Sequence, residues 1–324
     1  MGHVQRETAR GIPVGFVTNP AVLLPGLVLV MAESRGTPLP LAWQRHERHW
    51  RQNAYCYPVV SRRSGGLSVG INLNPDKACN FDCVYCQVER RTPAAVRRVD
   101  LDRVRSELMA LVDVAVDRSL FSEAPFDAIG PDDRRVRDFA FSGDGEPTTC
   151  PKFAEAVELA AEVRRVRGLE DTKLVLITDA CYLTRPEVRR GLGVLDANNG
   201  EVWAKLDAGT EPYYRAVNRP NYPLSHVLEN LLDASRGRPI VIQSLWMRLH
   251  GEAPPDGEVE AFAGRLNDLL SAGGQIQRVQ VYTIARQTAE PYAAALSRAE
   301  LDRIAQVIAE SAAVPIEQYD SGVA

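Results

Sequence analysis

Three cysteines with regular spacing offer the clearest chemistry in the chain. Cys79, Cys83 and Cys86 lie in the segment ACNFDCVYCQ at 78–87 and are half of the six cysteines in 324 residues. A structural zinc site takes four ligands, commonly as two C-x2-C pairs. Iron–sulfur clusters are also held by thiolates, and a 4Fe–4S cluster with three cysteine ligands leaves one iron open. The C-x3-C-x2-C spacing favours such a cluster over two alternatives, a zinc site completed by a distant ligand and unrelated buried thiols.

A glycine-rich acidic loop follows about 60 residues later, in the segment SGDGEPT at 142–148. Gly143 and Gly145 would let the backbone approach a ligand closely because glycine has no side chain. Asp144 and Glu146 supply carboxylates beside them. We predict that this loop binds a cofactor, although an ordinary turn has a similar composition.

Further polar residues close two later apolar runs. Thr178 and Asp179 follow KLVLI, and Lys205 and Asp207 lie at the end of VWAKL. Thr178, Asp179 and Asp207 are candidates for cofactor binding. A buried Lys205–Asp207 pair with a structural role is the alternative for the last two.

The elements that would position these residues alternate regularly. Short apolar runs lie at 68–73, 138–142, 173–178, 202–206, 239–246 and 278–284. Helical patterns follow at 100–116, 151–165, from about 185, at 224–235, 257–271 and 297–311. Such alternation predicts parallel strands joined by crossover helices, and the near-continuous apolar runs fit strands covered on both faces. The predicted fold class is α/β, a partial (β/α)6 TIM-like barrel whose strand ends carry the chemistry.

Residues 1–67 show weaker periodicity and are interpreted as an N-terminal extension packed on a barrel domain at 68–324. Gly65–Gly66 could join the two. His46 and His49 in RHERHW lie three residues apart, but a metal site would need a further ligand, so an amphipathic helix is the simpler interpretation.

The cysteine motif, with Tyr85 before its last cysteine, resembles the cluster motif of the radical S-adenosylmethionine (SAM) superfamily. SGDGEPT resembles the glycine-rich GGE motif of that superfamily, with Asp144 where glycine is usual. The resemblance implies a partial barrel, a 4Fe–4S cluster on Cys79, Cys83 and Cys86, and SAM bound to the open iron. It leaves the partner of the SAM amino group open between Asp144 and Glu146.

A broader resemblance covers roughly residues 57–311 and is to a radical SAM subfamily related to the tRNA wyosine-base synthases. The segments that carry it are 57–93, 141–148, 205–220 and 279–291. Those synthases have a second cluster on cysteines N-terminal to the main motif, where this chain has only Cys56. Cys150 and Cys181 lie elsewhere, and all three are interpreted as small buried side chains.

Charge is distributed unevenly although the net charge is only −4. Residues 1–105 hold 15 Lys and Arg against 8 Asp and Glu, whereas the remainder holds 23 against 34. Such asymmetry can mark a face that meets phosphate-bearing ligands, but it also arises from solvated arginines. Sparse cysteine and the absence of a long apolar run favour a soluble, cytoplasmic protein that does not enter a membrane.

These resemblances imply an oxygen-sensitive enzyme that cleaves SAM reductively and abstracts hydrogen from a substrate, with RNA modification as one version. An external one-electron donor of the flavodoxin or ferredoxin type is implied as a partner. The alternative is a non-catalytic iron–sulfur electron carrier or binding module, which would have no use for the loop at 142–148.

Overall fold

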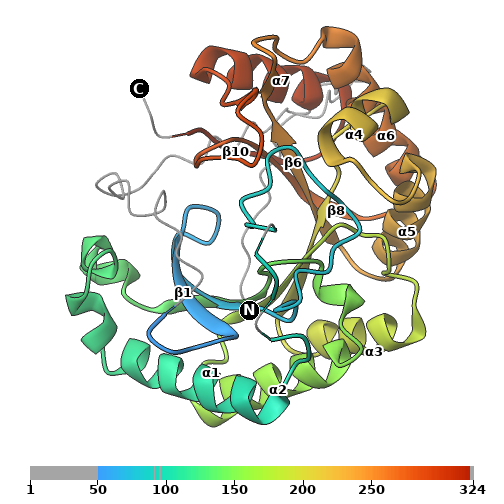
Figure 1. Cartoon of the computed structure of the whole chain (residues 1–324). Helices are drawn as coiled ribbons and strands as arrows, with labels where there is room; N and C mark the ends of the chain where they lie inside the picture. Colours follow the sequence, from blue (N-terminus) through green and yellow to red (C-terminus); the bar gives the residue numbers. More distant parts are fainter. Residues whose placement is uncertain (1–49, 91, 95, 322–324) are drawn as a thin grey trace, which may run out of the picture.

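The fold is organised around one curved sheet of eight strands (Figure 1). The structure is a computed structural model, and it describes residues 50–90, 92–94 and 96–321. Its order is β1-β2-β3-β4-β5-β6-β8-β10. These strands are β1 (Cys56–Ser61), β2 (Gly66–Ile71), β3 (Val136–Phe141), β4 (Lys173–Thr178), β5 (Gly200–Lys205), β6 (Ile240–Trp246), β8 (Ile276–Thr283) and β10 (Ile316–Tyr319).

The strands are parallel from β2 to β10, and β1 runs antiparallel to β2. The six central strands correspond to the six predicted runs within two residues at either end. The prediction of a partial TIM-like barrel is therefore confirmed. β1 and β10 form the two edges and were not among the six runs.

Helices cover the outer face of the curved sheet (Figure 1). They are α1 (Leu101–Val116), α2 (Phe153–Val166), α3 (Pro186–Asp196), α4 (Glu211–Asn218), α5 (Leu224–Gly237), α6 (Asp256–Ser271) and α7 (Arg298–Ser311). Their ends follow local chemistry. Asp100 accepts from two backbone N–H groups of the first turn of α1, and Ser297 and Glu300 form a capping box on α7.

Burial explains why the strands are so apolar. Every residue of β2 and of β6 is buried, as expected where helices cover one face and side chains fill the other. Three short 3-10 turns follow α1, and the two-residue strands β7 (Arg248–Leu249) and β9 (Ala293–Ala294) form a separate ladder. No helix in the described part of the chain is both long and apolar enough to cross a membrane.

The described part of the N-terminal extension is joined to the barrel by the β1–β2 ladder and, just before β1, by one buried carboxylate. Glu107 on α1 accepts hydrogen bonds from the backbone N–H groups of Ala54, Tyr55 and Cys56, at 2.8 to 3.1 Å. These hydrogen bonds fix the backbone at the point where β1 begins. His46, His49 and the rest of 1–49 lie outside the described residues, and the division at residue 67 stays a prediction.

Candidate active site

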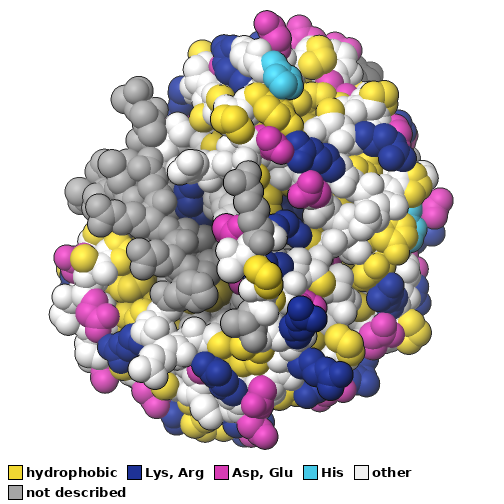
Figure 2. Space-filling model, viewed as in Figure 1, with side chains coloured by type: hydrophobic (Ala, Val, Ile, Leu, Met, Phe, Trp, Pro, Cys, Tyr) yellow, Lys and Arg dark blue, Asp and Glu magenta, His cyan; other side chains and the backbone are white. Residues whose placement is uncertain are grey.

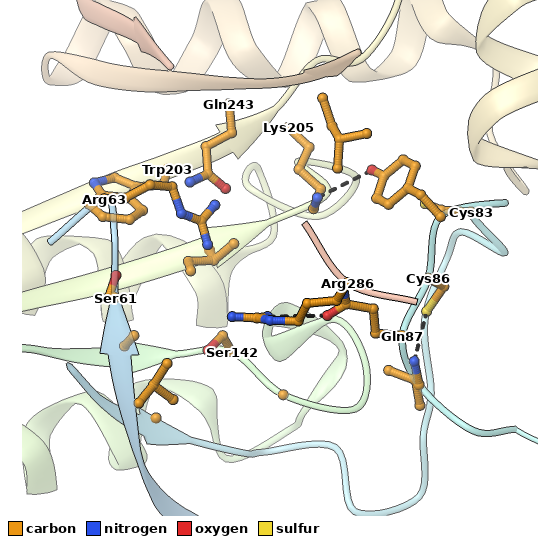
Figure 3. A pocket seen from close by; sticks show the side chains of 18 of the residues that line it. Ser61, Arg63, Cys83, Cys86, Gln87, Ser142, Trp203, Lys205, Gln243 and Arg286 are labelled. Carbon is orange, nitrogen blue, oxygen red and sulfur yellow. Dashed lines mark hydrogen bonds between the residues drawn. The ribbon is translucent and has the colours of Figure 1, made fainter. Parts of the chain in front are cut away.

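A cavity of about 290 Å³ opens on the concave side of the sheet, where the parallel strands end. Most of the candidate site residues form its wall, and Figure 3 shows part of that wall. They are Cys79, Cys83, Cys86, Gly143, Gly145, Glu146, Thr178 and Asp179. Asp144 and Asp207 are not part of the described wall. In the space-filling view, Lys and Arg side chains lie around the centre of this face (Figure 2).

The cysteine loop is fixed from two sides by backbone hydrogen bonds. On one side, the N–H of Glu146 donates to the carbonyl of Ala78 at 2.9 Å. On the other side, Asp82 and Val84 donate to the carbonyls of Asn218 and Val217 at the end of α4, at 3.0 and 2.9 Å. The β3–α2 loop and α4 therefore hold the part of the loop that carries Cys79 and Cys83, and the N–H of Ala289 holds Cys86 by donating to its carbonyl at 2.9 Å.

Donors surround two of the sulfur atoms. Asn218 Nδ2 lies 3.4 Å from Cys83 Sγ, while Val88 N and Arg90 Nη2 lie 3.5 and 3.8 Å from Cys86 Sγ. Hydrogen bonds of this kind stabilise thiolates and tune the potential of an iron–sulfur cluster. Burial raises the pKa of both the Cys79 and the Cys83 thiols to about 12. The thiols would be protonated until a metal centre replaced the proton.

Among the described residues, no three His, Cys, Asp or Glu side chains lie close enough to hold a single metal ion. The thiolates of a cluster bind different irons, so they need to face a common space and not a common point. Cys79, Cys83 and Cys86 do face a common cavity, and two of their sulfurs have hydrogen-bond donors. The donor set fits a cluster.

Glu146 is buried and accepts hydrogen bonds at both carboxylate oxygens. Thr148 N, Thr148 Oγ1 and Thr178 Oγ1 lie 3.0, 2.6 and 2.7 Å from Oε1. The N–H of Asp179 donates to Oε2 at 2.7 Å. Glu146 therefore ties the end of β3 to the end of β4, and the Thr178 hydroxyl is used in that connection.

Asp179 lies beside this carboxylate and is itself 3% exposed. Its Oδ1 accepts from Cys181 N at 2.9 Å and from Asn80 Nδ2 at 3.4 Å, whereas Oδ2 has no hydrogen-bond partner in the described part of the chain. Burial and the neighbouring Asp179 raise the pKa of Glu146 to about 8, and burial raises the pKa of Asp179 as well. Two adjacent buried acids with a vacant acceptor oxygen form a site for a cation.

Gly145 is required where the acidic loop meets the cysteine loop. A Cβ atom at this position would lie 2.0 Å from the carbonyl oxygen of Ala78. Asp144 points elsewhere, because its Oδ2 accepts from Asn72 Nδ2 at 2.8 Å and its backbone N–H donates to Asn72 Oδ1 at 3.2 Å. Asp144 is thus engaged with Asn72, whereas Glu146 lines the cavity beside Asp179.

Asp207 is buried below the cysteine loop, where it orients other side chains. Its Oδ1 accepts from Leu245 N at 2.9 Å, and its Oδ2 accepts from Asn218 Nδ2 at 2.8 Å and from the Tyr85 hydroxyl. Lys205 Nζ lies 3.2 Å from the same hydroxyl, so Tyr85 connects the two charges. This arrangement matches the structural alternative for Asp207, whereas the described contacts of Lys205 use only one of its ammonium protons. A direct role of Asp207 in cofactor binding stays a prediction.

The remaining cysteines lie away from the described wall of the cavity. Cys56, Cys150 and Cys181 are all buried and carry free thiols. Burial raises the pKa of each of them, which keeps these thiols neutral and matches their interpretation as small core side chains.

Several cavity residues have no signal in the sequence motifs. Arg63 comes from the turn between β1 and β2, Trp203 from β5, Gln243 from β6 and Tyr282 from β8. Only the alternation of residues along the strands could have suggested that Trp203, Gln243 and Tyr282 point inward. Arg63 has no such signal, because it lies in the segment that the sequence assigns to the extension.

No protein-family model matches the chain. It is 31% identical over 176 residues to a UPF0026 protein of Methanocaldococcus jannaschii, which covers 54% of this chain and 46% of that protein. A UPF0026 protein of Helicobacter pylori is 25% identical over 181 residues, covering 55% and 51%. A protein named GTPase Obg from Brachyspira hyodysenteriae is 24% identical over 267 residues, covering 80% and 34%. The chain thus spans between a third and half of the length of these relatives.

Among solved structures, a radical SAM methyltransferase from Sphaerobacter thermophilus matches with a TM-score of 0.57. The match has 13% identity and covers 81% of this chain and 68% of that chain. The chain has the fold of a radical SAM enzyme. The fold that the resemblance implies is therefore confirmed. The sequence contains no G-x-x-x-x-G-K-[S/T] phosphate-binding motif.

Proposed function

We propose that the protein is a radical SAM enzyme with its active site in this cavity. One observation carries the proposal. Three thiols and a pair of buried acids, one with a vacant acceptor oxygen, face the same space at the ends of β2, β3 and β4. A site for metal-binding sulfur next to a site for a cation suits a ligand that carries an amino group and a sulfonium.

Cys79, Cys83 and Cys86 would hold a 4Fe–4S cluster, and an external flavodoxin- or ferredoxin-type protein would reduce it. The bound cluster would supply the single electron for reductive cleavage of SAM, and the chemistry that results would be abstraction of hydrogen from a substrate. Hard chemistry of this kind belongs to the cofactors, and the protein supplies orientation and electrostatics.

The side chains of this protein would have three tasks. Asp179 Oδ2, with Glu146 Oε2 beside it, would accept hydrogen bonds from the SAM amino group and offset its charge. Asn218, Val88 and Arg90 would donate to thiolate sulfur and fix the orientation of the ligands. Burial of the acids and thiols would keep water from the reacting atoms.

Anaerobic reconstitution with iron and sulfide, followed by dithionite and SAM, tests the proposal. We expect 5′-deoxyadenosine by chromatography from the wild-type protein. In Cys83→Ala, we expect a loss of cluster iron and a decrease in 5′-deoxyadenosine of more than about 100-fold, since chemistry without the cluster has no electron source. Cys150→Ala is the matched control, because it removes a buried thiol outside the described wall and should retain the iron.

A cluster that forms fully but never cleaves SAM would overturn the proposal. That result would favour the electron carrier or binding module. The vacant oxygen of Asp179 argues against a carrier, because electron transfer alone requires no cation site next to the cluster ligands.

A further inference from the structure

One wall of the cavity has a chemistry unlike that of the cysteine and acid residues. It is formed by Arg63, Gln243 and Lys205, which Figure 3 shows along one side of the cavity with Trp203 beside Arg63. We refer to Arg63, Gln243 and Lys205 as the anion wall. The proposed function above uses none of these three residues.

Arg63 is held in place by aromatic rings. Its guanidinium carbon lies 5.6 Å from the centroid of the Trp203 ring and 5.2 Å from that of Tyr282. Such contacts position a cation without using its N–H groups. Among the residues that the structure describes, none accepts a hydrogen bond from this guanidinium, so its planar set of donors is available to a carboxylate or a phosphate.

Gln243 presents an acceptor whose orientation is fixed from outside the cavity. Gln280 Nε2 donates to the Glu317 carboxylate at 3.3 Å, which fixes the orientation of the Gln280 amide. The Oε1 atom of that amide accepts from Gln243 Nε2 at 2.8 Å, so Gln243 Oε1 is the oxygen left toward the cavity. Gln243 is fully buried, and its Oε1 atom has no partner within the described residues. An unpartnered buried oxygen costs free energy, and a ligand with an N–H or O–H group would relieve that cost.

Lys205 completes the wall. Its Nζ atom lies 3.2 Å from the Tyr85 hydroxyl, which itself donates to Asp207, so one of three ammonium protons is used there. The two acids near this wall already accept hydrogen bonds. Both oxygens of Asp207 are engaged, and Asp138 accepts from Ser68 Oγ at 2.5 Å. The donors of Arg63 and Lys205 remain for a ligand.

We propose that the anion wall binds the acidic group of a small-molecule substrate, a carboxylate or a phosphate, with an N–H or O–H group next to it. Arg63 and Lys205 would bind the acid and Gln243 Oε1 would accept from the neighbouring donor. This inference rests on the proposed function, since it places the substrate of that same cavity. The proposed substrate is therefore a small anion and not a macromolecule.

Isothermal titration calorimetry on the anaerobically reconstituted protein tests the inference, with lactate, inorganic phosphate and uncharged lactamide as probes. We expect saturable binding of lactate or phosphate, whichever acid the wall prefers, and at least tenfold weaker binding of lactamide. Arg63→Met and Lys205→Met should each weaken anion binding at least tenfold. Arg63→Lys, which keeps the charge and loses the planar donors, should fall between wild type and Arg63→Met.

Arg97→Gln is the matched control, since Arg97 is exposed and lies outside the described cavity wall. It should bind the anion within twofold of wild type. Equal losses in Arg97→Gln and Arg63→Met, or no saturable binding of either anion, would overturn the inference. An oligoribonucleotide that binds where neither small anion does would replace it with an RNA surface. Because these titrations need no SAM cleavage, anion binding in a protein that forms no 5′-deoxyadenosine would refute the proposed function alone.

Discussion

The two sides of the cavity differ in the sign of the charge that they leave unsatisfied. At the ends of β3 and β4, Glu146 and Asp179 are adjacent buried acids, and one oxygen lacks a donor. Elsewhere on the wall of the same cavity, Arg63 and Lys205 have donors in excess of the acceptors around them. One concave surface thus offers a cation site and an anion site within the same 290 Å³.

This difference indicates how a single barrel end could bind two ligands in fixed positions. Each side is complementary to one charge and repels the other, so a cationic cofactor and an anionic substrate would not exchange places. Both sides touch the cysteine loop, the acidic side through the Glu146–Ala78 hydrogen bond and the anion wall through Lys205 and Tyr85, so the sign of the charge is what places the proposed cationic cofactor on the acidic side.

The largest effect should come from Asp179→Asn, which removes the charge of the acceptor that has no partner. A hydrogen bond to a charged group contributes about 1.5–3 kcal/mol, so the dissociation constant for SAM should rise about 10- to 100-fold. Equilibrium dialysis with the reconstituted protein would measure it.

Asp144→Asn is the control for this change, because Asp144 bonds to Asn72 and is not part of the described wall. Its dissociation constant for SAM should stay within a few-fold of wild type. If Asp144→Asn weakened binding more than Asp179→Asn, the cation site would have to be moved to the other end of the acidic loop.

A smaller effect is expected from pH. Burial and the adjacent Asp179 raise the pKa of Glu146 to about 8, so the ligand-free protein carries a proton there at neutral pH. A bound cation favours the carboxylate, so binding releases that proton and becomes weaker as the pH falls below 8. The dissociation constant for SAM should rise between pH 7.5 and pH 6 by at most about tenfold per unit, the limit for one proton.

The same titration in Glu146→Gln should lose this slope, because the titrating group is gone. A wild-type affinity that does not change between pH 6 and pH 7.5 would show that Glu146 is ionised before the ligand binds. Binding on the acidic side would then involve no uptake or release of a proton, and the two sides would differ only in the sign of their charge.

Much of the acidic side could be predicted from the sequence because its residues cluster along the chain. The cysteines fall within eight residues, and Gly143, Gly145 and Glu146 fall within four. Each group follows an apolar run that could be recognised as a buried strand. In a parallel sheet the carboxyl ends of the strands lie at the same edge, so the loops that follow these strands come together there. What the sequence could not assign was Asp179 Oδ2 as the vacant acceptor, since this depends on hydrogen bonds across three loops.

The anion wall could not be predicted, because its residues are 38 to 180 positions apart. Lys205 and Gln243 are register partners on the adjacent strands β5 and β6, and Arg63 reaches the same cavity from the turn between β1 and β2. β1 falls in the predicted extension because residues 1–67 show weak periodicity, and its Pro58 is tolerated because β1 is an edge strand. β10 was missed for a related reason. Its sequence IEQY is polar at two of four positions, as an edge strand with one buried residue can be.

The smallest effects concern stability and separate the two loops that meet on the acidic side. In Gly145→Ala the new Cβ would lie 2.0 Å from the Ala78 carbonyl, backbone against backbone, so the loops must move apart and weaken the Glu146–Ala78 hydrogen bond. Overpacking of this kind costs about 1–3 kcal/mol. Gly193→Ala in α3 is the matched control. Apart from its chain neighbours and the backbone of its own helix, no atom lies within 4 Å of the new Cβ, and alanine favours a helix by up to about 1 kcal/mol. Guanidinium unfolding should therefore show a lower free energy of unfolding for the first variant and an unchanged or higher value for the second. Equal values would mean that the two loops are not in contact, and the acidic side would lose its connection to the cysteines.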